Sequence, residues 1–294
     1  MRVYIITDLE GVNGVLNFND WCIPEGKRNE TACCFLTEEV NAAAEGFFAG
    51  GAAEVMVLDG HGSGGSIRGE YLDERAALQR GCKDFPVMLD NVDAIAFVGL
   101  HAKAGTANAH LAHTQTEEAL DFCINNVSIG EFGQFAYPYS ELNIPTIFAA
   151  GDLALTQEAK ELVPGIFTTA VKEGFNAPQG RECSADNLMA NESAALHYPR
   201  LQVLEDIRNQ CKLAAEKFLQ APESFAIKPL PGNAYTVTAE YRPTAKRLIP
   251  LVGELPLRKI KTSENATIAG AIKEFYTKRE WAKVDNQYII EIEQ

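Results

Sequence analysis

Short apolar runs alternate with longer amphipathic stretches through the first 180 residues of the chain. This alternation is typical of βαβ units and predicts an α/β fold with a mainly parallel sheet flanked by helices. The expected strands are Val3–Thr7, Glu54–Leu58, Ala94–Leu100, Pro145–Ala149 and Phe167–Val171. The expected helices are Thr37–Phe48, Glu70–Gln79, Glu131–Leu142 and Leu153–Leu162.

The pattern changes after residue 180. Asp186–Leu219 is predicted to be long and largely helical, with an interruption at Pro199. A Pro-rich passage follows, and then a predicted strand at Ala234–Tyr241 and a last helix at Ile268–Trp281. We therefore expect two domains, an α/β domain over residues 1–180 and a smaller C-terminal α+β unit over residues 181–294.

Composition narrows the class of protein. The 294 residues are 46% hydrophobic and 22% charged, as in ordinary globular proteins. A net charge of −14 without a stripe of Lys and Arg argues against nucleic acid as a partner. No apolar run is long enough for a bilayer, and the N-terminus lacks the features of a signal peptide. Seven cysteines, an odd number that includes adjacent Cys33 and Cys34, favour reduced thiols in a cytoplasmic protein.

Three predicted strands run directly into side chains that bind metals. Asp8 and Glu10 follow the first strand, Asp59 and His61 follow the second, and His101 follows the third. Ligands of open parallel sheets bind beyond the carboxyl ends of the strands, where these residues would converge. Imidazole and carboxylate together suit a borderline metal such as zinc.

Each of these residues also has a structural interpretation. Asp8 could cap a turn, and a single His at a strand end is more often a hydrogen-bonded structural residue than a ligand. Glu131 opens a predicted helix, where its charge would favour the helix N-terminus, and its position alone favours that role. The convergence of three strand ends, rather than any one residue, predicts a metal site.

Five short motifs occur together and in register. They are Asp8-Leu9-Glu10-Gly11, Asp59-Gly60-His61, Gly99-Leu100-His101-Ala102-Lys103, Ala112-His113-Thr114 and Gly130-Glu131-Phe132-Gly133. In this order they resemble the D-aminopeptidase family of zinc metallopeptidases, over roughly residues 1–175. The resemblance implies a cytoplasmic hydrolase that removes the N-terminal residue of short peptides, including peptides of D-amino acids. It also implies a homodecamer.

The resemblance assigns roles to individual residues. It implies two divalent metal ions per chain, of the zinc type, with Asp8 bridging them. Glu10 and His101 would complete one site, and His61 and Glu131 would complete the other. His113 falls on the family's catalytic histidine. With Asp8 counted twice, each ion has three protein ligands and keeps an open position for water or substrate.

Two alternatives remain. The stretch Gly60–Gly65 satisfies the G-x-G-x-x-G pattern of nucleotide-binding loops, and Asp90 lies near the position of a ribose-binding acid. This pattern follows the second strand rather than the first, and it leaves the acidic and histidine residues at the other strand ends unexplained. The second alternative is an inactive family member with a binding role, against which the intact ligand positions argue.

Overall fold

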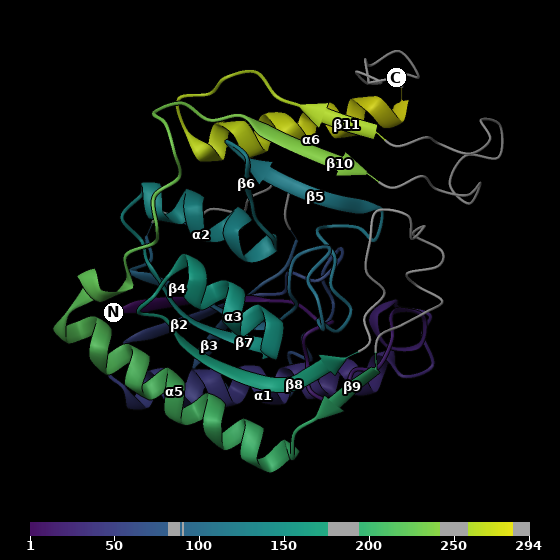
Figure 1. The fold of residues 1–294 in the computed structure, drawn as a ribbon. Helices are drawn as coiled ribbons and strands as arrows, with labels where there is room; N and C mark the ends of the chain where they lie inside the picture. The colour runs from purple at the N-terminus through teal and green to yellow at the C-terminus, as the bar shows by residue number, and fades with distance from the viewer. Residues whose placement is uncertain (82–88, 90, 176–193, 242–257, 285–294) are drawn as a thin grey trace.

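A seven-stranded sheet forms the centre of the molecule (Figure 1). The computed structural model describes residues 1–81, 89, 91–175, 194–241 and 258–284. The strand order is β3-β2-β1-β4-β7-β8-β9, and every pair is parallel except β8 with β9. The bounds are β1 Arg2–Thr7, β2 Glu54–Leu58, β3 Ala76–Gln79, β4 Ala94–Leu100, β7 Thr146–Asp152, β8 Phe167–Phe175 and β9 Ala194–His197. The predicted α/β class is confirmed.

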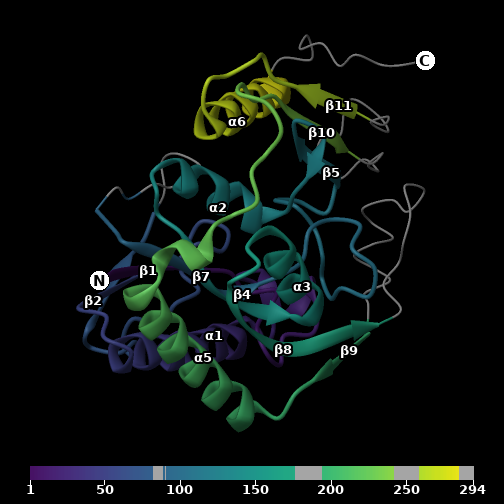
Figure 2. The same ribbon diagram turned by 60° about the vertical axis from the view of Figure 1, so that its left-hand side comes forward.

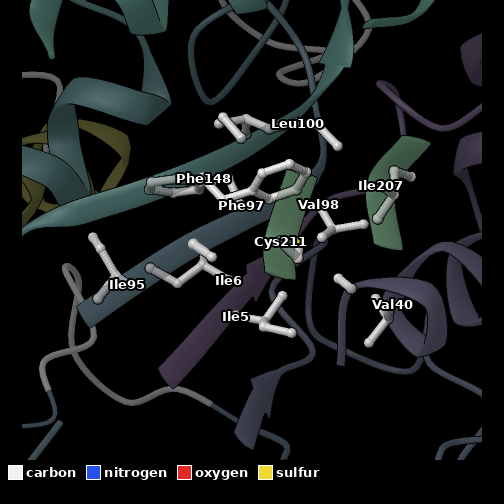
Figure 3. Close-up of a cluster of buried hydrophobic side chains, with 14 of the residues drawn as sticks. Ile5, Ile6, Val40, Ile95, Phe97, Val98, Leu100, Phe148, Ile207 and Cys211 are labelled. Carbon is white, nitrogen blue, oxygen red and sulfur yellow. The ribbon is translucent and has the colours of Figure 1, made fainter. Parts of the chain in front are cut away.

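The central strands are apolar on both faces because helices cover both sides of the sheet. Every residue of β4 and of β7 is buried. The side chains of Ile5, Phe97 and Phe148 belong to one continuous core, part of which is drawn in Figure 3. This core fixes the register of β1 against β4, and so sets which residues meet beyond the strand ends.

Helices cover both faces of the large sheet (Figures 1 and 2). The pair on one face is α1 Asn29–Ala49 and α5 Arg200–Gln220, and the pair on the other is α2 Glu131–Glu141 and α3 Leu153–Leu162. Gly46 allows α1 and α5 to approach closely, because a Cβ there would collide with the carbonyl oxygen of Arg208. Within the described residues, no helix has both the length and the apolar character needed to cross a membrane.

A second, four-stranded sheet lies above α2 in Figure 1. It is antiparallel, in the order β11-β10-β5-β6. Its strands are β5 Ala119–Ile124, β6 Val127–Ser128, β10 Val237–Tyr241 and β11 Arg258–Lys261, and it packs against α6 Ile268–Val284. Phe122 meets Phe275 edge to face at 5.0 Å in the small core between them. This sheet therefore combines strands from both sides of residue 180.

One predicted helix is wrong, and a second is wrong in part. Glu70–Gln79 is not helical, since its last four residues form β3 and pair with Val55–Leu58. Ala194–His197, inside the predicted helical stretch 186–219, forms β9 and pairs with Lys172–Phe175. In both places, pairing at a sheet edge overrides local helix propensity. The helix after Pro199 is confirmed as α5, while residues 186–193 lie outside the described residues.

Candidate metal centre

The turns after β1, β2 and β4 bring three candidate ligands together. Because β1 lies between β2 and β4, the carboxyl ends of these strands are neighbours. The Oδ1 atom of Asp8 is 3.0 Å from Nδ1 of His61, and its Oδ2 atom is 3.2 Å from Nε2 of His101. Asp8 thus lies between the two histidines.

Glycines allow the backbones to crowd at this edge. Gly99 interrupts the pairing of β4 with β7 and has φ +77°, in the left-handed region that favours glycine. A Cβ at Gly99 would collide with the carbonyl oxygen of Asp8, and one at Gly11 would collide with that of Leu100. The glycines of two of the sequence motifs are therefore required by close backbone approach.

The candidate ligands form two neighbouring triads. The first consists of Asp8, Glu10 and His61, and the second of His101, His113 and Glu131. Within each triad the potential ligand atoms lie within 4.8 Å of one another. All five predicted metal residues and His113 are therefore brought to one place by the fold.

The grouping differs from the one that the family resemblance implies. Nδ1 of His61 is 3.2 Å from Oε2 of Glu10, and Nε2 of His101 is 3.4 Å from Oε1 of Glu131. Glu10 therefore lies with His61 and Glu131 with His101, whereas the resemblance pairs Glu10 with His101. His113 stacks on His101, with ring centroids 3.9 Å apart, and its Nε2 is 3.7 Å from Oε1 of Glu131.

Each histidine of the triads is oriented by a backbone carbonyl. Nε2 of His61 lies 2.7 Å from the carbonyl oxygen of Cys22. Nδ1 of His101 lies 2.9 Å from that of Ala102, and Nδ1 of His113 lies 2.9 Å from that of Leu111. A carbonyl oxygen only accepts, so these nitrogens donate. The opposite nitrogen of each ring points toward the carboxylates, where it could bind a metal ion in the neutral form of the ring. Such outer hydrogen bonds are the usual way in which ligand histidines are oriented.

The carboxylates and imidazoles of the cluster shift one another's pKa values toward the charged forms. Burial alone would lower the pKa of the His61 imidazole, but the carboxylates of Glu10 and Asp8 raise it to about 12. The pKa of His101 is raised in the same way, against its burial, by Glu131 and Asp8. Burial would raise the pKa of the Asp8 carboxyl, yet its hydrogen bonds with the two imidazoles hold it well below its usual range. The Asp8 carboxylate thus stays ionised and attracts cations.

The residues present fit divalent metal ions. Oε2 of Glu10 and Nε2 of His101 are buried, and each has only ion-pair contacts, the shortest at 3.2 Å, without the geometry of a good hydrogen bond, although buried polar atoms are normally hydrogen-bonded. Both atoms face into the cluster, where cations would satisfy them. A set of three carboxylates and three imidazoles matches the ligand preference of zinc.

Several residues that support the cluster gave no signal in the sequence. Lys172 on β8 is fully buried, and its Nζ donates to the carbonyl oxygens of Glu10 at 2.6 Å and Val15 at 3.2 Å. It therefore holds the loop that carries Glu10. Phe18 meets the ring of His113 edge-on at 5.3 Å. Such contacts depend on backbone atoms and on residues distant in sequence, so no local motif reports them.

Glu131 does more than favour the start of a helix. It is the first residue of α2, where a negative charge is favourable, but its Oε1 also accepts from the backbone N–H of Gln115 at 2.7 Å. That same oxygen faces His101 and His113. The structural interpretation and the ligand interpretation of this residue are therefore compatible. His110 is buried and belongs to neither triad.

The Gly60–Gly65 loop does not have the structure of a phosphate-binding loop. A phosphate-binding loop would offer the N–H groups at its far end to the phosphate. Here the Asp59 carboxylate accepts hydrogen bonds from the backbone N–H groups of Gly65, Ser66 and Ile67 at 2.8, 2.9 and 3.2 Å. The described chain after it continues through turns into β3 rather than into a helix. Both features argue against the nucleotide-binding alternative.

Comparison with known proteins gives three findings. A family model described as D-aminopeptidase (peptidase family M55) matches residues 1–265. A D-aminopeptidase of Bacillus subtilis (strain 168) is 34% identical over 179 residues, which are 59% of this chain and 64% of that protein. The match thus spans slightly less than two thirds of that relative.

A solved structure has the same fold. It is the "Zn-dependent D-aminopeptidase DppA from Bacillus subtilis, a self-compartmentalizing protease", with a TM-score of 0.74 and 21% sequence identity. The superposition covers 98% of this chain and 100% of that one. The arrangement of the two sheets and their helices is therefore shared along essentially the whole length.

Proposed function

This chain belongs to the D-aminopeptidase family of peptidases, and from that membership we propose that it is a binuclear, zinc-dependent aminopeptidase acting on short peptides. The observation that carries the proposal is the pair of adjacent triads, with Asp8 between them, at the carboxyl ends of β1, β2 and β4. This is the edge at which α/β enzymes place their catalytic groups.

Asp8 would be shared by the two ions. One ion would be held by Asp8, Glu10 and His61, and the other by Asp8, His101 and Glu131, following the grouping of the side chains. Three protein ligands per ion leave room for water or substrate, as in catalytic zinc sites. His113 would then be free for acid–base work.

The chain's own residues supply the rest of the chemistry. Divalent ions bound here would polarise the scissile carbonyl and lower the pKa of a water molecule. His113 keeps its Nδ1–H on the carbonyl of Leu111, so its Nε2 can take a proton from the attacking water and give it to the leaving amine. Stacking on His101 and the edge of Phe18 hold this ring in one orientation.

The substrate would be a di- or tripeptide with a free N-terminal amine. Two adjacent cationic sites can take the amine and the neighbouring carbonyl oxygen together, which favours cleavage of the first peptide bond. Preference for D-residues follows from the D-aminopeptidase relatives, whose names specify that activity.

A small substrate panel tests this function. We expect hydrolysis of D-Ala-D-Ala to exceed that of L-Ala-L-Ala, because the family acts on D-residues. N-acetyl-D-Ala-D-Ala should be cleaved at least about 100-fold more slowly, equivalent to about 2.7 kcal/mol of lost transition-state binding, since its amine is blocked. The measurement is release of free alanine by the zinc-loaded protein. Equal cleavage of the acetylated peptide would contradict an aminopeptidase, and no cleavage by a fully metal-loaded protein would favour an inactive binding protein.

We also propose that the chain assembles into a homodecamer. The structural relative is described as self-compartmentalizing, and enclosure of the active sites would admit short peptides while excluding folded proteins. Ten chains of 32.1 kDa predict a mass of about 320 kDa by light scattering coupled to gel filtration. A mass near that of one chain at working concentration would contradict the proposed assembly without affecting the metal site.

A further inference from the structure

Two buried carboxylates, Asp152 at the start of helix α3 and Glu158 within it, accept hydrogen bonds from backbone segments that lead to the candidate metal ligands. Asp152 ends β7 and caps α3, with its Oδ1 accepting from the backbone N–H of Leu155 at 3.1 Å. Its Oδ2 accepts from the backbone N–H of His110 at 3.1 Å, on the loop that leads to His113. The helix and this loop are thus joined at one side chain.

Glu158 joins two further segments of the centre. Its Oε2 accepts from the backbone N–H of Lys103 at 2.9 Å, and its Oε1 accepts from that of Gly130 at 3.2 Å. Lys103 is two residues after His101, and Gly130 is the residue before Glu131. One carboxylate therefore links the backbone that carries His101 to the backbone that carries Glu131.

The fit around this carboxylate is close. Gly130 has no room for a side chain, because a Cβ there would lie 2.7 Å from Oε1 of Glu158 and 2.7 Å from Cβ of Lys103. Glu158 itself is buried, and a buried carboxylate is costly unless its oxygens are hydrogen-bonded. An apolar side chain would fill this position on α3 at lower cost, so a packing role alone does not account for a glutamate here.

We infer that Glu158 is a positioning residue for the His101–His113–Glu131 triad, fixing the separation of the His101 and Glu131 backbones through its two hydrogen bonds. This inference rests on the proposed metal sites. The side-chain hydrogen bonds of Glu158 end on the segments of the second triad. The first triad is held instead by Lys172, through the Glu10 carbonyl, and by Cys22, through His61. Loss of the Glu158 carboxylate should therefore affect one metal site and spare the other.

The test measures zinc affinity at each site separately. Glu158→Gln keeps the size of the side chain but turns one acceptor oxygen into an NH₂ group that opposes a backbone N–H. In a His61→Ala background, which isolates the second triad, we expect Glu158→Gln to weaken zinc binding by about 10- to 100-fold, the range seen when a hydrogen bond that holds metal ligands in place is lost. In a His101→Ala background, which isolates the first triad, zinc binding should change by less than about threefold, within the usual variation of remote substitutions.

Competition with a chromogenic chelator gives both affinities without reference to catalysis. Glu161→Gln is the matched control, because Glu161 is exposed on the same helix and should change neither affinity. If Glu158→Gln does not fold, Glu158→Asp serves instead, since its shorter carboxylate cannot reach both N–H groups.

The outcomes separate this inference from the proposed function. Wild-type protein that binds fewer than two zinc ions would contradict the binuclear proposal itself. Two ions in the wild type, with equal weakening of both isolated sites by Glu158→Gln, would show a general structural role and overturn the inference. Unchanged affinity at the second triad, even with a lowered melting temperature, would overturn it as well.

Discussion

Replacing Asp8 with alanine is expected to empty both metal sites and to reduce peptide hydrolysis by at least about 10⁴-fold, equivalent to about 5.4 kcal/mol of transition-state stabilisation. The two oxygens of Asp8 face different histidines, His61 at 3.0 Å and His101 at 3.2 Å. Removing the side chain takes a ligand from each proposed site and also leaves two imidazoles without their shared carboxylate. No other single residue belongs to both sites in the proposed grouping.

Zinc content per chain, measured by atomic emission after gel filtration, checks this expectation. Wild-type protein should hold close to two ions and Asp8→Ala close to none, whereas His61→Ala and His101→Ala should each lose mainly one. Asp93→Ala is a suitable control, since Asp93 is exposed and caps the opposite end of β1 by accepting from the N–H of Arg2 at 2.7 Å. Two ions retained in Asp8→Ala would rule out a bridging role.

The central strands could be predicted because burial on both faces of the sheet requires continuous apolar runs in the sequence. β1, β2 and β4 are short apolar runs followed directly by polar residues, and the connection from β1 to β2 contains a long helix, α1, as parallel pairing requires. The convergence of the candidate ligands could be predicted by the same logic, since neighbouring parallel strands bring their carboxyl ends together.

The edge strands could not be predicted in this way. Ala76–Gln79 and Ala194–His197 are only partly buried, and their composition suits a helix as well as a strand. They form strands because each pairs with a neighbouring strand of the large sheet, Ala76–Gln79 with β2 and Ala194–His197 with β8. The small sheet is harder still, because β5 pairs with β10 across more than 100 residues of sequence.

The pairing of ligands within the centre also lay beyond the sequence. The five sequence motifs identified the candidate ligands. Which carboxylate faces which imidazole depends on the conformation of the turns after β1 and β4. Gly11 and Gly99 allow those turns to cross closely, and the result places Glu10 against His61 rather than against His101. The supporting carbonyls of Cys22, Ala102 and Leu111 have no side-chain signature at all.

His113→Ala is expected to lower kcat by about 10³-fold while zinc content stays close to two ions per chain, the range usual for loss of a general acid–base group. The reason is positional: Nε2 of His113 faces Glu131 at 3.7 Å, while the proposed ligands of both ions are complete without it. Its Nδ1 is committed to the carbonyl of Leu111, so proton transfer is left to Nε2.

Zinc content and kcat must be measured on the same preparation, because the geometry also permits a different result. The ligand atoms of His113, His101 and Glu131 lie within 4.8 Å of one another, close enough for all three to hold one ion. If His113→Ala loses one ion, His113 is a ligand and the proton must pass through another group. Phe18→Leu distinguishes the two roles further, because it removes the ring that meets His113 edge-on but removes no ligand. If His113 acts only in proton transfer, its less constrained ring should lower kcat and leave zinc affinity unchanged.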